Sequence, residues 1–278
     1  MISRAILGTT SYGFRYLLRD ERRAPPLAHL VGRVADLQLE AFQVCENARP
    51  LALPPGGWKD AVNAARDRRV ELHVGCMTLD PATLARYMDL AAAIPNPLVR
   101  VVLEEEGQGA ATHEAIDRFL DKAGPRVERA GMTLAIENHF HIPCRKLAEL
   151  AFRLPPPLAG FCIDTANSLR NWESPAHVFA LLGPRALEFH LKDFVVRGSN
   201  VGFSVGGSPL GEGDLDLAWC AERILKHNPA PRVFLENWVP ETGDWRADVA
   251  ADAEWLRRSA EGAREVLLNA PSSGRESF

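Results

Sequence analysis

Four short and mostly apolar segments in the second half of the chain each run directly into a carboxylate or an imidazole. The segments are residues 132–136, 158–163, 186–189 and 232–235, and they are followed by Glu137, Asp164, His190 and Glu236. Apolar runs of this length, bounded by turn residues, are typical of buried β-strands. Polar groups at the same end of successive parallel strands meet in space, although they are far apart in the sequence. The pattern therefore favours a parallel sheet that carries a site at its carboxyl edge.

Four more strand-like segments precede these, and segments with helical spacing separate them. The expected strands are residues 4–8, 34–39, 70–75 and 98–103, and the expected helices are residues 58–69, 80–93, 112–129, 145–152, 174–183, 216–226 and 246–268, with a further helical segment after Pro26 that ends near Gly32. Strands that alternate with helices indicate a parallel sheet, and eight such units predict a single (β/α)8 TIM barrel. We expect the barrel to span residues 1–270 and residues 271–278 to form a flexible tail.

An open, doubly wound sheet is the alternative architecture. Such a sheet usually has a glycine-rich phosphate loop after its first strand, and residues 8–13 match that loop poorly. The length of 278 residues suits one barrel, which typically takes about 250 residues. The closed barrel is therefore the preferred prediction.

The composition narrows the classes of function. The net charge of −4 disfavours a general nucleic-acid binder or a binder of anionic membranes. No stretch is long enough to span a membrane, and the first apolar run is too short for a signal peptide. The five cysteines include no Cys-x-x-Cys pair, as is typical of thiols in a reducing compartment. We therefore expect a cytoplasmic protein that binds neither nucleic acid nor membrane.

The four strand-end residues predict a metal site. Active sites of (β/α)8 barrels lie at the carboxyl ends of the strands, where Glu137, Asp164, His190 and Glu236 are expected. Asp164 alone could cap the segment after it, and His190 alone could be a core histidine. Carboxylates gathered without a cation would repel one another, however, so we predict one divalent ion. An oxygen-rich set suits Mn²⁺ best, with Mg²⁺, Co²⁺ or Zn²⁺ as alternatives.

Further candidates follow from their places near the expected strand ends. Lys192 and His139 each lie two residues beyond a predicted ligand, so in extended backbone they share its side. Lys192 could stabilise an enolate or hold a substrate carboxylate, and His139 could be catalytic or pack behind the site. The expected pocket residues are Tyr12, Glu40, His73, Glu104, Asn167 and Trp238. Each of three residues has an alternative role: His73 could lie in the core, Asn167 could close a turn, and Trp238 could pack in the core. The glycine-rich residues 194–213 are typical of a lid or binding loop.

The motifs resemble those of the xylose-isomerase-like barrel superfamily, which contains sugar isomerases, epimerases and related lyases. The resemblance covers nearly the whole chain and is carried by residues 136–139, 162–165, 189–193, 210–213 and 235–237. It implies that Glu137, Asp164, His190 and Glu236 bind one divalent metal. As in the ketose 3-epimerases, it also implies that Glu137 and Glu236 form the acid/base pair.

Two departures separate the chain from the ketose epimerases. Their motif after strand six resembles Asp-Thr-x-His, whereas this chain has Asn167 at the last position. Their substrate-binding arginine matches Val196 here, with Arg197 beside it as the candidate. Conversely, His139 and Lys192 resemble the lyase and dehydratase branches, in which a histidine two residues beyond the glutamate can serve as base.

The prediction is a metal-dependent enzyme that forms an enediolate from a small keto sugar or sugar acid. An isomerase or epimerase is the default, and a decarboxylase or dehydratase on the same site is the alternative. A nuclease like endonuclease IV is a weaker alternative, because that activity needs a trinuclear zinc cluster with many histidines. A barrel without activity that serves as a binding subunit is a third class. Barrels of this kind often pair, so a homodimer is one expectation, although no interface patch is legible.

Overall fold

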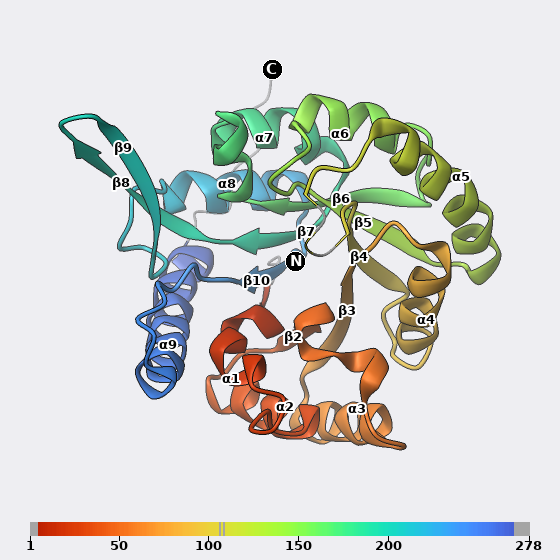
Figure 1. The fold of residues 1–278 in the computed structure, drawn as a ribbon, viewed down its shortest axis with the longest axis horizontal. Coiled ribbons are helices and arrows are strands. Elements are labelled where there is room, and N and C mark those ends of the chain that lie inside the picture. Colours follow the sequence, from red (N-terminus) through yellow and green to blue (C-terminus); the bar gives the residue numbers. More distant parts are fainter. Residues whose placement is uncertain (1–4, 106, 108, 270–278) are drawn as a thin grey trace.

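Eight parallel strands close into a barrel. A computed structural model of the protein describes residues 5–105, 107 and 109–269. The strands follow one another around the barrel in the order β1-β10-β7-β6-β5-β4-β3-β2 (Figure 1). They are β1 (Ile6–Thr10), β2 (Ala41–Val44), β3 (Glu71–Met77), β4 (Leu98–Val102), β5 (Thr133–Glu137), β6 (Ala159–Asp164), β7 (Ala186–Leu191) and β10 (Arg232–Leu235). The predicted TIM barrel is confirmed, and the predicted tail at 271–278 lies outside the described residues.

Helices surround the strands, as Figure 1 shows. They are α1 (Arg15–Arg19), α2 (Leu27–Asp36), α3 (Gly57–Arg68), α4 (Pro81–Ala91), α5 (His113–Ala130), α6 (Cys144–Ala151), α7 (Pro175–Leu182), α8 (Leu217–His227) and α9 (Trp245–Asn269), with 3-10 turns at Ser11–Phe14, Glu46–Ala48, Pro50–Ala52, Asn167–Asn171 and Gly183–Arg185. Asp80 accepts hydrogen bonds from the N–H groups of Ala82 and Thr83 at the start of α4, as the Asp-Pro signal predicts. Among these helices, none is long and apolar enough to cross a membrane.

The second strand begins later in the chain than predicted. Helix α2 passes through Gly32 and ends at Asp36, so it takes up the first part of the segment that was expected to be a strand. Leu30, Val31 and Val34 are fully buried, and their spacing is that of one helix face. Strand β2 starts at Ala41. The prediction of a strand at 34–39 is therefore wrong.

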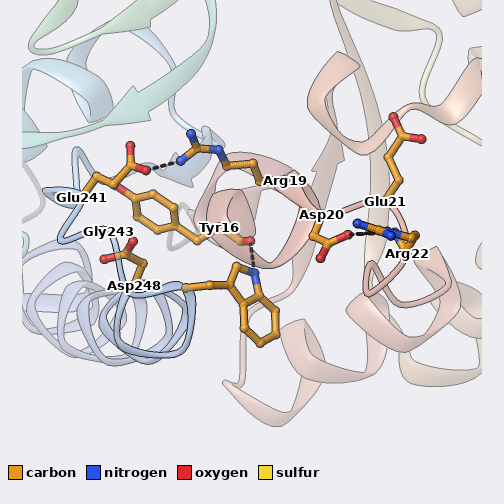
Figure 2. Close-up of a pocket in the computed structure, with 9 residues that line it drawn as sticks. Tyr16, Arg19, Asp20, Glu21, Arg22, Glu241, Gly243 and Asp248 are labelled. Atoms are coloured by element: carbon orange, nitrogen blue, oxygen red, sulfur yellow. Dashed lines mark hydrogen bonds and ion pairs between the residues drawn. The ribbon is translucent and has the colours of Figure 1, made fainter.

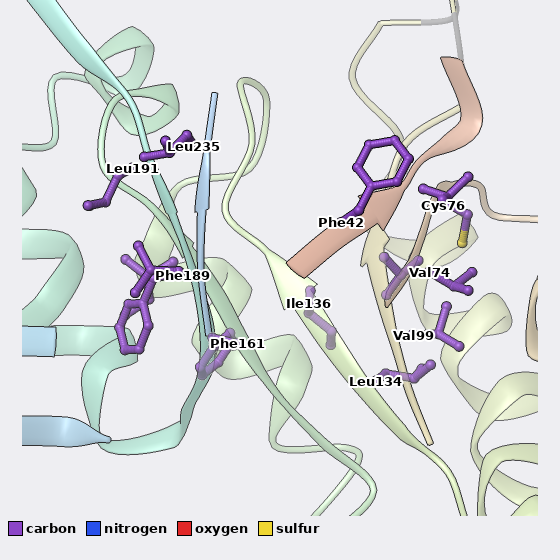
Figure 3. Packing of buried hydrophobic residues seen from close by; sticks show 14 of the residues in the cluster. Phe42, Val74, Cys76, Val99, Leu134, Ile136, Phe161, Phe189, Leu191 and Leu235 are labelled. Carbon is purple, nitrogen blue, oxygen red and sulfur yellow. The ribbon is translucent and has the colours of Figure 1, made fainter. Parts of the chain in front are cut away.

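The strands direct apolar side chains toward the helices and polar ones into the barrel. The apolar layer includes Phe42, Val74, Val99, Leu134, Ile136, Phe161, Phe189, Leu191 and Leu235 (Figure 3). Each such side chain contributes roughly 1.5–3 kcal/mol when it is fully buried. The inward positions carry Gln43, Arg100, Glu188 and His190, all of them buried. Because this barrel is filled largely by polar groups, its interior is able to hold charge.

A two-stranded hairpin follows the seventh barrel strand and projects from the barrel (Figure 1). It consists of β8 (Asp193–Ser199) and β9 (Gly202–Ser208) in antiparallel pairing. Residues 194–213 were expected to be an irregular lid loop, so this expectation is corrected for most of the segment. A side chain at Gly207 would lie 2.2 Å from the carbonyl oxygen of Trp238, and this close approach requires glycine. The base of the hairpin is thus held against the loop after β10.

Candidate metal centre and active site

The four predicted metal ligands come together at the carboxyl end of the barrel. Glu137 and Asp164 close β5 and β6, His190 lies in β7, and Glu236 follows β10 directly. His190 Nδ1 lies 3.4 Å from Glu137 Oε2 and 3.4 Å from Glu236 Oε1. Ligand atoms of Asp164, His190 and Glu236 all lie within 4.8 Å of one another. All four residues are buried, so the site has little contact with water.

Two ligand atoms of this group are buried without a hydrogen bond. Asp164 Oδ1 accepts the backbone N–H groups of Ala166 and Asn167 at 2.8 and 2.7 Å. Within the described part of the chain, neither Asp164 Oδ2 nor His190 Nδ1 has a hydrogen-bond partner. Buried polar atoms without partners are uncommon and can mark the place of an ion. The donor set therefore fits a divalent cation bound by Asp164 Oδ2, His190 Nδ1 and the glutamates.

Gln43 selects the form of His190 that can bind a metal. The ring nitrogen His190 Nε2 lies 2.9 Å from Gln43 Oε1, and Gln43 Nε2 donates to Glu188 Oε1 at 2.8 Å. Since the amide nitrogen of Gln43 is committed to Glu188, its oxygen must accept a hydrogen from Nε2. The lone pair of a neutral His190 then lies on Nδ1, which faces the carboxylates.

Replacing Gln43 by methionine should weaken the binding of Mn²⁺ about 10–100-fold, because Nε2 loses the acceptor that sets the tautomer. Isothermal titration with Mn²⁺ measures the affinity. Cys220→Ala is the control, since this buried thiol lies on helix α8 and belongs to none of the possible ligand groups among the described residues. Equal affinities for Gln43→Met and the unchanged protein would contradict the role of Gln43.

Lys192 is the cation of the site. Its ammonium lies 2.9 Å from Glu236 Oε2 and 3.0 Å from Asp164 Oδ2, and it donates to Asn167 Oδ1 at 3.1 Å. Burial alone would lower the pKa of Lys192, but the carboxylates of Asp164 and Glu236 raise this pKa above its ordinary value. Lys192 therefore stays charged, as a fixed positive group beside the ligands.

A second buried cation, Arg100 of β4, pairs with the other glutamate. Arg100 Nε donates to Glu137 Oε2, and one of its terminal nitrogens lies 3.4 Å from Glu46 Oε2. The hydroxyl of Tyr12 donates to the other oxygen of Glu46 at 2.6 Å. Tyr12 is thus connected to Glu137 through Glu46 and Arg100. The sequence prediction placed Tyr12 near the site but missed Arg100 and Glu46.

Several other candidates surround the ligand layer. His139 Nδ1 lies 3.0 Å from Glu104 Oε2. Burial alone would raise the pKa of Glu104, but the neighbouring imidazoles lower this pKa below its ordinary value. The ring of Trp238 lies 5.2 Å from Lys192 Nζ, so it forms an apolar wall beside the ammonium. In extended backbone, residues two positions apart point to the same side. The contact between Lys192 and the ring of Trp238 and the contact between His139 and Glu104 are consistent with this expectation.

Asn167 connects the two halves of the site. Its side-chain nitrogen donates to Glu137 Oε1 at 3.0 Å, and its oxygen accepts from Lys192. The amide therefore orients both charged groups, and the substrate contact that was expected for it remains a prediction.

Three predicted pocket residues lie elsewhere. Glu40 precedes β2, at the amino end of the barrel, because the strand starts later than predicted. Strand β3 continues to Met77, so His73 lies within the barrel, where it approaches Glu71 and Glu188 at 3.5 and 3.7 Å. Arg197 lies on the projecting hairpin and is exposed. These placements correct the expectation that the three residues line the pocket.

Besides Glu46, sequence reasoning missed three residues of this site, Gln43, Arg100 and Glu188. Each lies inside an apolar strand rather than at its end. A polar residue within a buried strand is a usable signal, because it needs a partner inside the barrel. The identity of that partner depends on which strands face each other.

A separate hollow of about 730 Å³ lies between α1 and the start of α9, and Figure 2 shows its lining. None of the four predicted ligands lines it. Two ion pairs, Arg19 with Glu241 and Arg22 with Asp20, line it, and the indole N–H of Trp245 donates to the carbonyl oxygen of Tyr16.

Asp252 of α9, close to this hollow, predicts a pH dependence of stability. It is buried and accepts the N–H of Tyr16 at 2.8 Å, and burial raises the pKa of Asp252 to about 7. Between pH values of about 4 and 7 the unfolded chain releases a proton that the folded chain keeps. The free energy of unfolding should therefore fall by up to about 4 kcal/mol over this interval and then level off.

Asp252→Asn should remove this slope, and urea unfolding at several pH values measures it. Asp60→Asn on the exposed side of α3 is the control and should keep the slope. A variant Asp252→Asn that loses stability with pH as the unchanged protein does would disprove the assignment.

The comparisons with known proteins agree with the fold. The family model described as xylose isomerase-like TIM barrel matches residues 31–259. A 3-oxo-isoapionate decarboxylase from Pectobacterium atrosepticum is 25% identical over 258 residues, which cover 91% of this chain and 93% of that protein. A 2-epi-5-epi-valiolone 7-phosphate 2-epimerase from an Actinoplanes species is 31% identical over 208 residues, which cover 68% of this chain and 69% of that protein.

A solved structure extends the agreement in fold. The xylose isomerase-like TIM barrel protein from Mycobacterium smegmatis in complex with magnesium superposes with a TM-score of 0.70 at 14% identity, over 93% of this chain and 98% of that one. At this identity the likeness concerns the fold alone. With the family model covering most of its length, this chain belongs to the xylose isomerase-like TIM barrel family.

Proposed function

We propose that this protein is a divalent-metal-dependent lyase that decarboxylates a small β-keto sugar acid. The observation that carries the proposal is the pairing of Glu137 and Glu236 with fixed cations. Glu137 is bound by Arg100, and Glu236 is bound by Lys192. The pairing bears directly on whether these carboxylates can act as bases.

An epimerase needs a base on each face of its substrate, and a carboxylate in a buried ion pair is a weak base. Burial alone would raise the pKa of Glu236, but the charges of Lys192 and Arg100 lower this pKa far below its ordinary value. Decarboxylation needs no base, because the bond that breaks is a carbon–carbon bond. It needs positive charge where the electron pair arrives, and Lys192 supplies that charge.

The groups of the chain then have separate tasks. When the carbon–carbon bond breaks, carbon dioxide leaves and the electron pair passes to the keto oxygen. The ammonium of Lys192 stabilises the negative charge on that oxygen. His139, held through Nδ1 by Glu104, offers its other nitrogen for the proton that the carbon takes up.

Glu137, Asp164, His190 and Glu236 would hold the cation, and Mn²⁺ or Mg²⁺ suits their oxygen-rich set. A bound divalent cation supplies Lewis-acid polarisation of the keto group. The decarboxylase among the relatives supports this reaction class, since its match covers nearly the whole of both chains.

An isomerase or epimerase is the second candidate. Glu137 and Glu236 approach the same nitrogen of His190 at 3.4 Å, so they could face one substrate from two sides. The relative named as an epimerase shares 31% identity. In this alternative the two glutamates move a proton through an enediolate.

Mass spectrometry in D₂O separates the two candidates. Protein loaded with Mn²⁺ is incubated with a panel of β-keto sugar acids and ketoses, with Asp164→Asn as the inactive control. A product that has lost carbon dioxide and carries solvent deuterium supports the decarboxylase. A product of unchanged composition with one exchanged deuterium would refute it and support the isomerase or epimerase.

We still predict that the protein is cytoplasmic and that it forms a homodimer. Light scattering of the purified protein measures the second. The expected partner remains a small keto sugar or sugar acid.

A further inference from the structure

We propose that Glu104, His139 and His141 bind a second divalent cation, of the zinc class, at the mouth of the barrel. The three residues follow β4 and β5 directly. None of them belongs to the four-residue site already described. The zinc would replace the contact between Glu104 and His139 Nδ1, and it would leave free the other nitrogen of His139, to which the proposed function assigns a proton transfer.

The distances fit an ion. Glu104 Oε2 lies 3.0 Å from His139 Nδ1 and 3.0 Å from His141 Nδ1. One ligand atom from each of the three residues lies within 4.8 Å of the other two. Ligands of a tetrahedral zinc ion lie about 2.0–2.2 Å from the metal and therefore about 3.4 Å from one another. The two distances from Glu104 Oε2 need to widen by only about 0.4 Å to match this separation.

Missing hydrogen bonds within the cluster also favour a bound ion. Although His141 Nδ1 lies 3.0 Å from the carboxylate, it forms no hydrogen bond with any described residue, and neither does Glu104 Oε1. When two ligand atoms direct their lone pairs at the same ion, they lie close together, but neither lone pair is directed at the other atom. In the main site His190 Nδ1 likewise forms no hydrogen bond, and Asp164 Oδ2 forms none although it lies 3.0 Å from Lys192 Nζ.

The environment leaves room for a further ligand. The Glu104 side chain is 5% exposed, whereas the His139 and His141 side chains are 16% and 24% exposed. With one buried carboxylate and two partly exposed imidazoles as ligands, the zinc ion keeps a fourth coordination position for water or a substrate oxygen. His73 offers a contrast inside the barrel, because its two nitrogens face different carboxylates, Glu188 and Glu71, and share no common point.

The ligand types separate the two sites chemically. The main site has three carboxylates and one imidazole, which suit a hard cation such as Mn²⁺. The second set has two imidazoles and one carboxylate, a combination that zinc enzymes use with an open position. Zn²⁺ should therefore occupy the second set when Mn²⁺ occupies the first.

The experiment counts metal per chain in the full-length protein by equilibrium dialysis and elemental analysis, with Mn²⁺ in large excess and Zn²⁺ limited to about one equivalent per chain, because most sites bind Zn²⁺ more tightly than Mn²⁺. The unchanged protein should retain zinc and manganese. Glu104→Gln and His141→Gln should each lose the zinc and keep the manganese, whereas Asp164→Asn should lose the manganese and keep the zinc. Because His141 is partly exposed, its variant should fold even if Glu104→Gln does not.

His177→Gln is the matched control, since His177 also approaches a glutamate, at 3.7 Å from Glu173, on the surface of α7. It should keep both metals. Zinc retained equally by Glu104→Gln, His141→Gln and the unchanged protein would overturn the second site. Loss of zinc in these two variants, with no manganese in any protein, would support the second site and refute the metal requirement of the proposed function.

Discussion

Replacing Lys192 by methionine is expected to lower kcat/KM by about 100–1,000-fold and, at the same time, to tighten the binding of Mn²⁺. The loss of activity follows because the keto oxygen loses the preorganised positive charge that stabilises its developing negative charge. The gain in affinity follows because the ammonium lies 3.0 Å from Asp164 Oδ2 and 2.9 Å from Glu236 Oε2. These are two of the proposed ligands, and a neighbouring positive charge repels a cation.

The metal-free variant should also unfold more easily. Removal of one partner from a buried ion pair costs about 3–5 kcal/mol, and Asp164 and Glu236 would lose the nearest positive charge. Addition of Mn²⁺ should restore most of this stability. Activity assays at saturating Mn²⁺, calorimetric titration and thermal melting measure the three effects separately.

Lys146→Met is the control for the loss of a lysine charge. Lys146 pairs with Glu149 on the surface of α6, where an ion pair contributes little. Its variant should keep the activity, the metal affinity and the melting temperature. Full turnover by Lys192→Met would remove the basis of the decarboxylase proposal, and weaker Mn²⁺ binding would show that Lys192 supports the metal.

Asp164→Asn is expected to abolish turnover and to make the melting temperature insensitive to Mn²⁺. The amide keeps an oxygen for the N–H groups of Ala166 and Asn167, so the turn after β6 should persist. It loses the negative charge that Oδ2 offers to the ion. Chelation of the unchanged protein should cause the same loss of activity.

The size of the stabilisation follows from mass action. A ligand present at a thousand times its dissociation constant stabilises the folded state by about 4 kcal/mol, which corresponds to roughly 8 °C or more in melting temperature. Melting curves with and without Mn²⁺, for both proteins, measure this shift. An equal shift in Asp164→Asn would show that Mn²⁺ binds elsewhere, and activity in excess chelator would contradict the metal requirement.

The elements that sequence reasoning located well have local causes. Asp80 caps α4 and Ser174 caps α7 through side-chain oxygens that accept nearby N–H groups, and such signals are confined to a few residues. Glu40 was misplaced because the segment before it has apolar residues that fit a helix as well as a strand.

The sequence by itself determined the alternation of strands and helices and the position of three carboxylates and one imidazole at the strand ends, because both are properties of short segments. Only the tertiary structure decided which groups meet inside the barrel. Gln43 reaches Glu188 and His190 across the interior, and Glu104 meets imidazoles from the loop after β5. Strands far apart in the chain face one another only when the sheet closes with a definite register, and no short segment encodes that register.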